Sequence, residues 1–292
     1  MYQQLIDEFI QREGLPDSYA SDARQCFLPL IRDIIEAMQS AQQRPYFLGI
    51  NGAQGTGKST LAALLSSLLE QAGYRVAKLS IDDFYYSRAR RQELAVAVHP
   101  LLGSRGVPGT HDVDLALMLM QQFKNAGSGD YITLPGFDKA RDDCMARAAC
   151  TRLQGPIDVV ILEGWFVGAT PQNEEELSEA INDLERSEDG DGRWRAYVNR
   201  ALAGDYQKIF AQLHMLVMLQ APDFEAIFQW RSLQEAKLRE HAPRDATGLM
   251  DEKAIARFIQ HFERLTRHCL RTLPQVADRV FRLDAQHRIH ES

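Results

Sequence analysis

Apolar residues recur along this chain with two alternating periods. Short runs such as VVIL at residues 159–162 and HMLVMLQ at 214–220 are mostly apolar on successive positions, which is typical of strands buried on both faces of a parallel sheet. Longer segments between these runs repeat apolar residues every three or four positions, as at Leu61, Leu64, Leu65 and Leu68, which predicts helices with one buried face. The alternation predicts an α/β fold, a mostly parallel sheet flanked by helices.

The same pattern gives the bounds of the expected elements. Strands are expected at residues 46–51, 75–81, 131–135, 157–163, 213–219 and 278–283. Helices are expected at residues 58–72, 113–125, 193–211, 223–240 and 251–268, and two more within 1–43. The second of these N-terminal helices has one apolar side, formed by Leu28, Ile31, Ile34, Ile35 and Met38. The strongly acidic stretch at 173–194 predicts a solvated helix and loop inserted between elements of the sheet.

Composition excludes several classes of function. The 292 residues carry a formal net charge of −7, which argues against nonspecific binding of nucleic acid, because such binding needs a positive field. No apolar run has membrane-spanning length, and the amphipathic N-terminus with its acidic residues is unlike a signal or transit peptide. The four cysteines form no CxxC pair. We therefore expect a reduced cytoplasmic protein with no membrane or nucleic-acid partner and no zinc framework.

A glycine-rich segment follows the first predicted strand. The pattern G-x-x-x-x-G-K-[ST], the P-loop, is matched by Gly52, Ala53, Gln54, Gly55, Thr56, Gly57, Lys58 and Ser59, with Thr60 directly after it. In such a loop, glycines let backbone N–H groups converge on a phosphate, and the start of the next helix adds its positive dipole end. Lys58 is expected to contact the β- and γ-phosphates, and Ser59 to ligate Mg²⁺. The flanking strand and helix favour a nucleoside triphosphate site over a glycine-rich turn without a ligand.

Motifs that mark other P-loop proteins do not occur in the sequence. A GTPase is expected to carry N-K-x-D and a transporter-type ATPase L-S-G-G-Q, and neither is found. The strand at 157–163 ends in the single Glu163, whereas mechanical ATPases commonly end this strand in Asp-Glu. Since phosphate binding alone does not define a function, these differences are what favour a small-molecule kinase.

Three carboxylates follow predicted strands, at the edge where ligands bind in open α/β sheets. Asp82 and Asp83 lie in KLSIDDFYYSR, together with Tyr85, which we expect to contact the substrate. Either aspartate could orient a substrate hydroxyl or accept its proton, or the pair could merely cap a turn. Glu163 could hold a Mg²⁺-bound water or the substrate, or it could form a buried ion pair.

Two polar segments are expected on the P-loop side of the sheet. They contribute the candidate substrate residues Arg105, His111 and Asp112 from one segment and Asp138, Lys139 and Arg147 from the other. Arginine suits an anionic substrate because its guanidinium binds a carboxylate bidentately. The alternative for both segments is an ordinary solvated loop, where turn residues and charges are common.

The helix at 223–240 carries Arg231, Lys237 and Arg239. Kinases of this kind need cations that close over the phosphoryl group during transfer, often from a mobile helix. We favour Arg231 for this role, and Arg239 could share its face of the helix. The alternative is a solvated helix on which Glu235 and Arg239 pair.

The chain resembles the P-loop kinases that include uridine kinase, phosphoribulokinase and bacterial pantothenate kinase. The likeness lies in the order of GxxxxGKST, LSIDDFY, THD, FDKA, VVILEGW and WR. The chain is more similar still to the plant-type D-glycerate 3-kinase family, through RGVPGTHD, PGFDKA, DGRWRAYVNRALAGDYQKIF and QAPDFEAIFQWR. This likeness covers about residues 45–285, and the N-terminal helices match weakly.

The resemblance implies a five-stranded parallel core with a helical lid, ATP and Mg²⁺ as cofactors, and phosphoryl transfer to a small alcohol. Asp82 occupies the position of the relatives' catalytic carboxylate, which favours it over Asp83 as the base. Glu163 matches their acidic residue after the central strand. One departure concerns the acceptor site: Phe137 stands where the glycerate kinases carry a tyrosine, and the Gly-rich run after it is missing.

These observations predict a kinase domain at residues 45–292, with the helices of residues 1–44 packed on it. The expected catalytic residues are Asp82, Lys58, Glu163 and Arg231. The expected acceptor is a small alcohol that bears a carboxylate, with D-glycerate leading. Alternatives are a pantothenate-like, nucleoside or sugar-phosphate acceptor and, from another class, a nucleotide-dependent regulatory protein.

Overall fold

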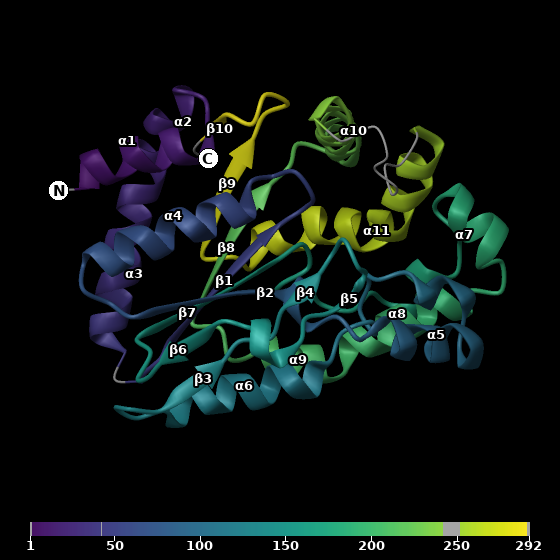
Figure 1. Ribbon diagram of the computed structural model, residues 1–292. Helices are drawn as coiled ribbons and strands as arrows, with labels where there is room; N and C mark the ends of the chain where they lie inside the picture. The colour runs from purple at the N-terminus through teal and green to yellow at the C-terminus, as the bar shows by residue number, and fades with distance from the viewer. Residues whose placement is uncertain (1, 42, 242–251, 291–292) are drawn as a thin grey trace.

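A six-stranded sheet forms the centre of the computed structural model (Figure 1). The structure describes residues 2–41, 43–241 and 252–290, and of 234–241 and 252–253 it describes the backbone only. The strand order is β10-β9-β8-β1-β7-β2. The strands are β1 (Tyr46–Gly52), β2 (Val76–Ser80), β7 (Val159–Gly164), β8 (Met215–Gln220), β9 (Arg279–Leu283) and β10 (Ile289–His290).

The sheet confirms the predicted α/β fold with a five-stranded parallel core. Neighbours from β9 to β2 pair in parallel, and β10 adds an antiparallel edge strand. All residues of β1 and β7 are buried, which explains why most of them are apolar. Along β7, Val159 and Ile161 join one hydrophobic cluster and Val160 and Leu162 the other, because successive strand residues point to opposite faces.

Helices cover both faces of the sheet (Figure 1). One face packs against α1 (Tyr2–Glu13), α3 (Leu28–Ser40) and α4 (Lys58–Gln71). A short helix, α2 (Ser18–Asp22), and a short π-helix (Ala23–Phe27) lead into α3. The other face packs against α6 (Val113–Asn125), α9 (Asp205–Phe210) and α11 (Glu252–Thr272). No helix in the described ranges combines the length and apolar character needed to cross a bilayer.

The N-terminal helices contribute directly to the core. Ile6 and Phe9 of α1 and Ile31 and Ile34 of α3 are buried in the cluster that contains the central strands. Burial of several such side chains stabilises a fold by about 1.5–3 kcal/mol each. The division into residues 1–44 and 45–292 stays a prediction.

Several boundaries differ from the expected ones. The helix expected at 193–211 is two helices, α8 (Arg193–Ala203) and α9, because Gly204 has a non-helical ψ of −126°. Helix α10 (Phe224–His241) lies as expected. Helix α5 (Arg88–Ala97) was not expected, since RARRQELAVA shows no clear apolar stripe.

The strand expected at 131–135 does not join the main sheet. It is shortened to β3 (Tyr131–Thr133), which pairs with β6 (Arg152–Gln154) in a separate two-stranded sheet. Pro135 follows it closely, and proline lacks the N–H that a longer ladder needs. A second small hairpin, β4 (Phe137–Asp138) with β5 (Asp143–Cys144), comes next.

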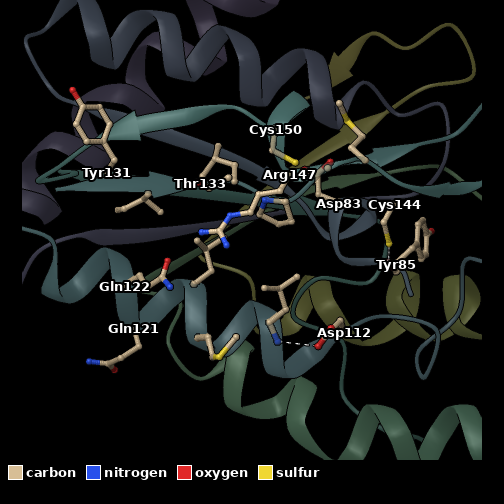
Figure 2. A pocket seen from close by; sticks show the side chains of 18 of the residues that line it. Asp83, Tyr85, Asp112, Gln121, Gln122, Tyr131, Thr133, Cys144, Arg147 and Cys150 are labelled. Carbon is tan, nitrogen blue, oxygen red and sulfur yellow. Dashed lines mark hydrogen bonds between the residues drawn. The ribbon is translucent and has the colours of Figure 1, made fainter. Parts of the chain in front are cut away.

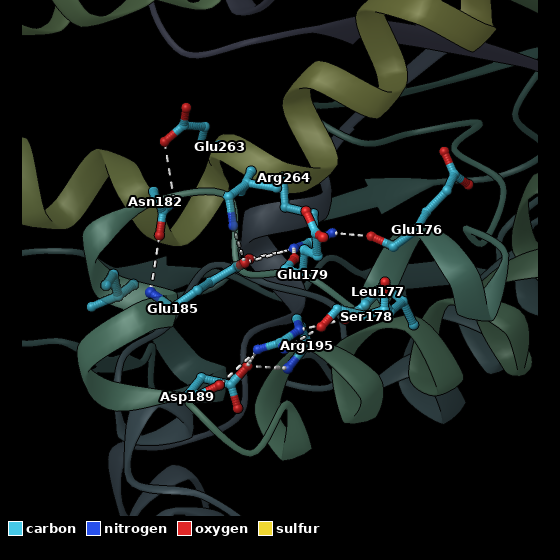
Figure 3. Close-up of polar contacts among 12 residues, drawn as sticks. Glu176, Leu177, Ser178, Glu179, Asn182, Glu185, Asp189, Arg195, Glu263 and Arg264 are labelled. Carbon is cyan, nitrogen blue, oxygen red and sulfur yellow. Dashed lines mark hydrogen bonds and ion pairs between the residues drawn. The ribbon is translucent and has the colours of Figure 1, made fainter.

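The acidic stretch at 173–194 is wrongly predicted to be solvated throughout. It contains a short helix, α7 (Asp183–Glu188), in which Glu185 is fully buried. Arg264 of α11 donates to both carboxylate oxygens of Glu185, at 2.7 and 2.6 Å. Asp189 is also fully buried and binds Arg195 of α8 at 2.9 Å (Figure 3). Buried charges are normally paired, and here the partners come from α8 and α11.

Candidate active site

The P-loop connects β1 to α4. Gly55 and Gly57 both have φ of +85°, a left-handed conformation that strains residues with a Cβ, and Gly57 is the N-cap of α4. The loop is closed by Thr56, whose hydroxyl donates to the Ala53 carbonyl at 2.8 Å. Of the predicted nucleotide residues, Gly52 thus ends β1, Ala53 to Gly57 form the loop, and Lys58, Ser59 and Thr60 form the first turn of the helix.

Ser59 and Glu163 meet across the edge of the sheet. The Ser59 hydroxyl donates to Glu163 Oε1 at 2.7 Å. Glu163 is buried, and its second oxygen, Oε2, has no hydrogen-bond partner among the described residues. A buried, unpartnered carboxylate oxygen beside a hydroxyl provides the oxygen ligands that Mg²⁺ prefers, so these two residues fit a magnesium site. The predicted alternative, a buried ion pair of Glu163, is not found among the described residues.

The sheet register brings Asp82 to the same edge. Glu163 of β7 lies opposite Ile50 of β1 on one side and Ser80 of β2 on the other. Directly after β2, a 3₁₀ turn (Ile81–Phe84) carries Asp82 and Asp83. The carboxyl ends of three adjacent parallel strands therefore hold the P-loop, Glu163 and the aspartate pair together.

Asp82 is held by two donors. Lys139 Nζ lies 2.6 Å from its Oδ2, and the Tyr85 hydroxyl donates to its Oδ1 at 2.9 Å. Burial alone raises the pKa of Asp82, but the charge and hydrogen bond of Lys139, helped by Lys58 and Tyr85, lower it overall. Asp82 is therefore an ionised carboxylate, as a proton acceptor must be.

Asp83 caps the turn. Its Oδ2 accepts from the Ser80 N–H at 2.8 Å, while Ser80 Oγ accepts from the Asp82 N–H at 3.3 Å. Burial, and then the charges of Asp82 and Glu163, raise the pKa of Asp83 to about 6. The capping alternative thus applies to Asp83, whereas Asp82 keeps its side chain turned to Lys139 and Tyr85.

The THD segment is bonded mainly to the fold itself. His111 is buried, stacks on Tyr85 with ring centroids 4.4 Å apart, and shares a 2.7 Å hydrogen bond with the Tyr206 hydroxyl. Burial lowers its pKa to about 3, so it is neutral. Asp112 caps α6 by accepting from the Leu115 N–H at 2.9 Å. His111 supports Tyr85, which in turn supports Asp82.

The β4–β5 hairpin places Lys139 over Asp82. Asp138 Oδ1 accepts from the N–H groups of Ala140 and Arg141 at 3.0 and 3.2 Å and so forms the hairpin turn. The end of this turn is fixed by Asp142, which pairs with Arg105 and also with Arg91, at 2.8 Å. Arg105 is therefore engaged within the protein, although it was expected to bind the substrate.

Arg91 is a site residue that the sequence did not reveal. It is buried, and its guanidinium also donates to the carbonyls of Tyr86, Gly103 and Asp142, at 3.2, 2.8 and 2.7 Å. An arginine in a helix without an apolar stripe gives no sign of burial. Its contacts join α5 to the hairpin that carries Lys139.

Proteins with similar sequences are P-loop kinases. The chain is 35% identical over 243 residues to mug58, an uncharacterised kinase of Schizosaccharomyces pombe, and the match covers 80% of this chain and 83% of that one. This chain belongs to the same family of P-loop kinases. It is also 25% identical over 225 residues to the chloroplastic D-glycerate 3-kinase of Arabidopsis thaliana, across 75% of this chain and 46% of that one.

The fold of the kinase agrees with this assignment. The D-glycerate 3-kinase of Cryptococcus neoformans matches it with a TM-score of 0.74, over 90% of this chain and 97% of that chain, at 24% identity. The sequence model of the methylmalonyl-CoA mutase-associated GTPase MeaB matches residues 19–86, a minor part of the chain that contains the P-loop. The predicted resemblance to P-loop kinases is confirmed.

Two further residues of the kinase touch the P-loop from the C-terminal part of the chain. His287 shares a 2.9 Å hydrogen bond with the Gly55 carbonyl and stacks on Trp230 of α10, with centroids 4.1 Å apart. Trp230 lies so close that a Cβ at Gly55 would be 3.0 Å from its own Cβ. Sequence analysis missed both residues, because neither belongs to the P-loop motif.

The expected cation of α10 has a defined contact. Arg231 follows Trp230 in the sequence. Its guanidinium lies 5.9 Å from the centre of the Phe258 ring of α11. The side chains of Lys237 and Arg239 lie outside the described residues.

Proposed function

We propose that this kinase transfers the γ-phosphoryl group of ATP to an alcohol, with D-glycerate as the leading acceptor. The observation that carries the proposal is the common edge of β1, β7 and β2, where the P-loop, the Ser59–Glu163 contact and Asp82 converge. Phosphoryl transfer needs a phosphate cradle beside a residue that positions and deprotonates the nucleophile. D-glycerate is taken from the names of the Arabidopsis and Cryptococcus relatives.

Residues 52–60 are proposed to hold the triphosphate. The left-handed Gly55 and Gly57 and the start of α4 suit phosphate oxygens, because they present N–H groups and a positive dipole end. Lys58 binds the β- and γ-phosphates, and Ser59 and Glu163 hold Mg²⁺. When bound, Mg²⁺ neutralises negative charge on the transferring group.

Asp82 is proposed as the base that takes the proton of the acceptor hydroxyl. Lys139, which is well exposed beside Asp82, is available to pair with the acceptor's carboxylate, as is Arg147. Arg231 is proposed to close over the phosphoryl group from α10. Asp83, Tyr85, His111, Asp112 and Asp138 shape the acceptor side through the contacts described above.

An assay of ADP release with Mg-ATP tests the acceptor. The panel consists of D-glycerate, L-glycerate, pantothenate, uridine and ribulose 5-phosphate. If D-glycerate alone stimulates the release of ADP, the proposal is supported. If another compound of the panel stimulates it instead, that compound takes the place of D-glycerate as the proposed acceptor. Hydrolysis that no alcohol changes contradicts it and favours a nucleotide-dependent regulatory protein.

Asp82→Asn tests the base. It is expected to abolish turnover while leaving ATP affinity unchanged, because Asp82 is bonded to Lys139 and Tyr85 rather than to the P-loop. Asp114→Asn, at an exposed position of α6, is the matched control. Loss of ATP affinity together with turnover contradicts the assignment of the base.

A further inference from the structure

A cavity of about 1050 Å³ runs between α6 and the segment 130–150 (Figure 2). Asp83 and Tyr85 line one end of it, next to the proposed base, and Asn125 and Tyr131 line the other. Both Leu115 and Asn125 of α6 line it, and a helix rises about 15 Å over that many residues. A three-carbon acid occupies only a small part of this space, since pockets of about 300–1,000 Å³ bind drug-sized ligands.

The walls of the cavity are largely apolar. Leu115, Met118 and Leu119 of α6 line it, as do Ile132 and Leu134 of the segment 130–150. Three large apolar side chains that the described residues expose also line it, namely Met118, Tyr131 and Met145, at 57%, 59% and 40% exposure. Exposed apolar side chains grouped around one cavity mark a binding site, whereas scattered ones do not.

One guanidinium points into this apolar space. Figure 2 shows Arg147 reaching toward the gap between Thr133 and Gln122. Within the described part of the chain, the side chain of Arg147 has no hydrogen bond or ion pair, and only its backbone carbonyl is bonded, to the Cys150 N–H at 3.3 Å. Arg90, which also lines the cavity, is already paired with Glu93 at 2.6 Å. Of the two arginines that line the cavity, Arg147 is therefore the one available to an anionic ligand, and a carboxylate is its natural partner.

The spacing along α6 sets the length of that ligand. From Leu115, near the Asp82 end, to Gln122, near Arg147, the helix rises about 10 Å. At about 1.2 Å per bond, an extended hydroxy acid of six to eight carbons spans about 8–11 Å from its terminal hydroxyl oxygen to a carboxylate oxygen, which is close to this distance.

We propose that the cavity is the acceptor site of this kinase and that it binds elongated hydroxy acids more tightly than the three-carbon D-glycerate named for the relatives. The apolar chain lies along α6, the carboxylate pairs with Arg147 and the hydroxyl lies at the Asp82 end. This inference rests on the proposed phosphoryl transfer at Asp82. In that step the hydroxyl oxygen bonds to the γ-phosphorus, the bond from this phosphorus to ADP breaks and Asp82 takes the proton.

Calorimetry on the full chain tests the cavity, with 4-hydroxybutanoate, 6-hydroxyhexanoate and 8-hydroxyoctanoate as ligands and D-glycerate as the reference. We expect the affinity to rise about threefold to fourfold for each methylene that enters the cavity. ADP release is measured with the same acids and is expected to rise in the same order.

Two variants and two matched controls locate the binding. Arg147→Gln is expected to weaken every acid at least about tenfold, and Met118→Glu to remove the dependence on chain length. Arg141→Gln and Val96→Glu alter side chains that are 86% and 91% exposed and do not line the cavity. These two controls are expected to change neither the affinity for the acids nor its dependence on chain length. Because Arg147 and Met118 are exposed as well, their variants are expected to fold.

The outcomes separate this inference from the proposed function. If the affinity depends neither on chain length nor on Arg147 while D-glycerate is still phosphorylated, the inference about the cavity is overturned and the proposed function stands. The same holds if the longer acids bind but are not phosphorylated while D-glycerate is. Absence of acceptor-dependent ADP release with every compound contradicts the proposed function and the acceptor site together.

Discussion

Lys139 Nζ donates a 2.6 Å hydrogen bond to Oδ2 of Asp82, although the two residues are 57 positions apart in the chain. Lys139 stands on the turn of the β4–β5 hairpin and Asp82 on the turn after β2. The hairpin is anchored through Asp142 to Arg91 and Arg105. The ionisation of the proposed base is thereby coupled to the position of a small hairpin outside the main sheet.

Replacing Lys139 by methionine is expected to raise the pKa of Asp82, because burial still acts on the carboxylate while the neighbouring charge and hydrogen bond are lost. A base acts only when deprotonated, so the acidic limb of kcat/KM is expected to move to higher pH. Rates measured between about pH 5 and 8 check this. Arg141→Met, on the same turn, is the control. If KM rises while the acidic limb stays at the same pH, Lys139 does not set the pKa of Asp82. Lys139 is then inferred to contact the acceptor instead.

Asp83→Asn is expected to stabilise the nucleotide-free protein at about pH 8 and to leave its stability nearly unchanged at about pH 4. The pKa of Asp83 is raised to about 6, by burial first and then by Asp82 and Glu163. A carboxyl whose pKa is raised on folding destabilises the fold once it ionises, so the penalty grows above the unfolded pKa and is complete above about pH 6.

Asparagine removes the charge at this position and keeps an oxygen to accept from the Ser80 N–H. A gain of roughly 1–2 kcal/mol at the higher pH is expected after allowance for solvent screening. Thermal unfolding at both pH values measures it, with Asp114→Asn, at an exposed position, as the control. Equal gains at both pH values rule out the burial of charge as the cause.

The parts of the molecule that were predictable are those in which one short segment determines its own structure. The residues of β1 and β7 are buried on both faces and are therefore mostly apolar, apart from Asn51 and Glu163 near the strand ends. The P-loop conformation is specified by its own glycines. Sequence periodicity and spacing record such local requirements directly.

The parts that were not predictable depend on partners far along the chain. The acidic sequence around Glu185 predicts a solvated side chain, because nothing near it shows that Arg264, 79 positions later, enters the same buried space. Likewise, Arg91 is hydrogen-bonded to Asp142, which is 51 positions away in the chain. His287 is hydrogen-bonded to Gly55, which is 232 positions away. Which loop supplies a partner is decided by the packing of the sheet and helices, which composition does not encode.

Glu163→Gln is expected to raise the Mg²⁺ concentration needed for half-maximal activity about 10–100-fold. The amide loses the negative charge of the buried carboxylate whose Oε2 has no other partner, while it can still accept from Ser59. ADP release is measured across a magnesium titration at fixed ATP. Glu70→Gln, at an exposed position of α4, is the control. An unchanged magnesium requirement removes Glu163 from the metal site.

The buried pair of Glu185 and Arg264 is expected to control stability rather than catalysis. Glu185→Ala leaves Arg264, whose side chain is only 10% exposed, without its charged partner, and such a loss costs about 3–5 kcal/mol. Glu188, on the same helix α7, pairs with Arg257 at 2.7 Å but is 39% exposed, so Glu188→Ala is expected to cost less than about 1 kcal/mol.

Urea unfolding of both variants measures the difference between a buried and an exposed pair on one helix, of which Figure 3 shows the buried one. The carbonyls of Glu176 and Glu179 also accept from Arg264, each at 2.6 Å. These bonds limit how far the guanidinium can move toward solvent after the substitution. If the two variants unfold at the same urea concentration, the Arg264 guanidinium has become hydrated in spite of these two hydrogen bonds. The Glu185–Arg264 pair then does not fix the acidic stretch to α11.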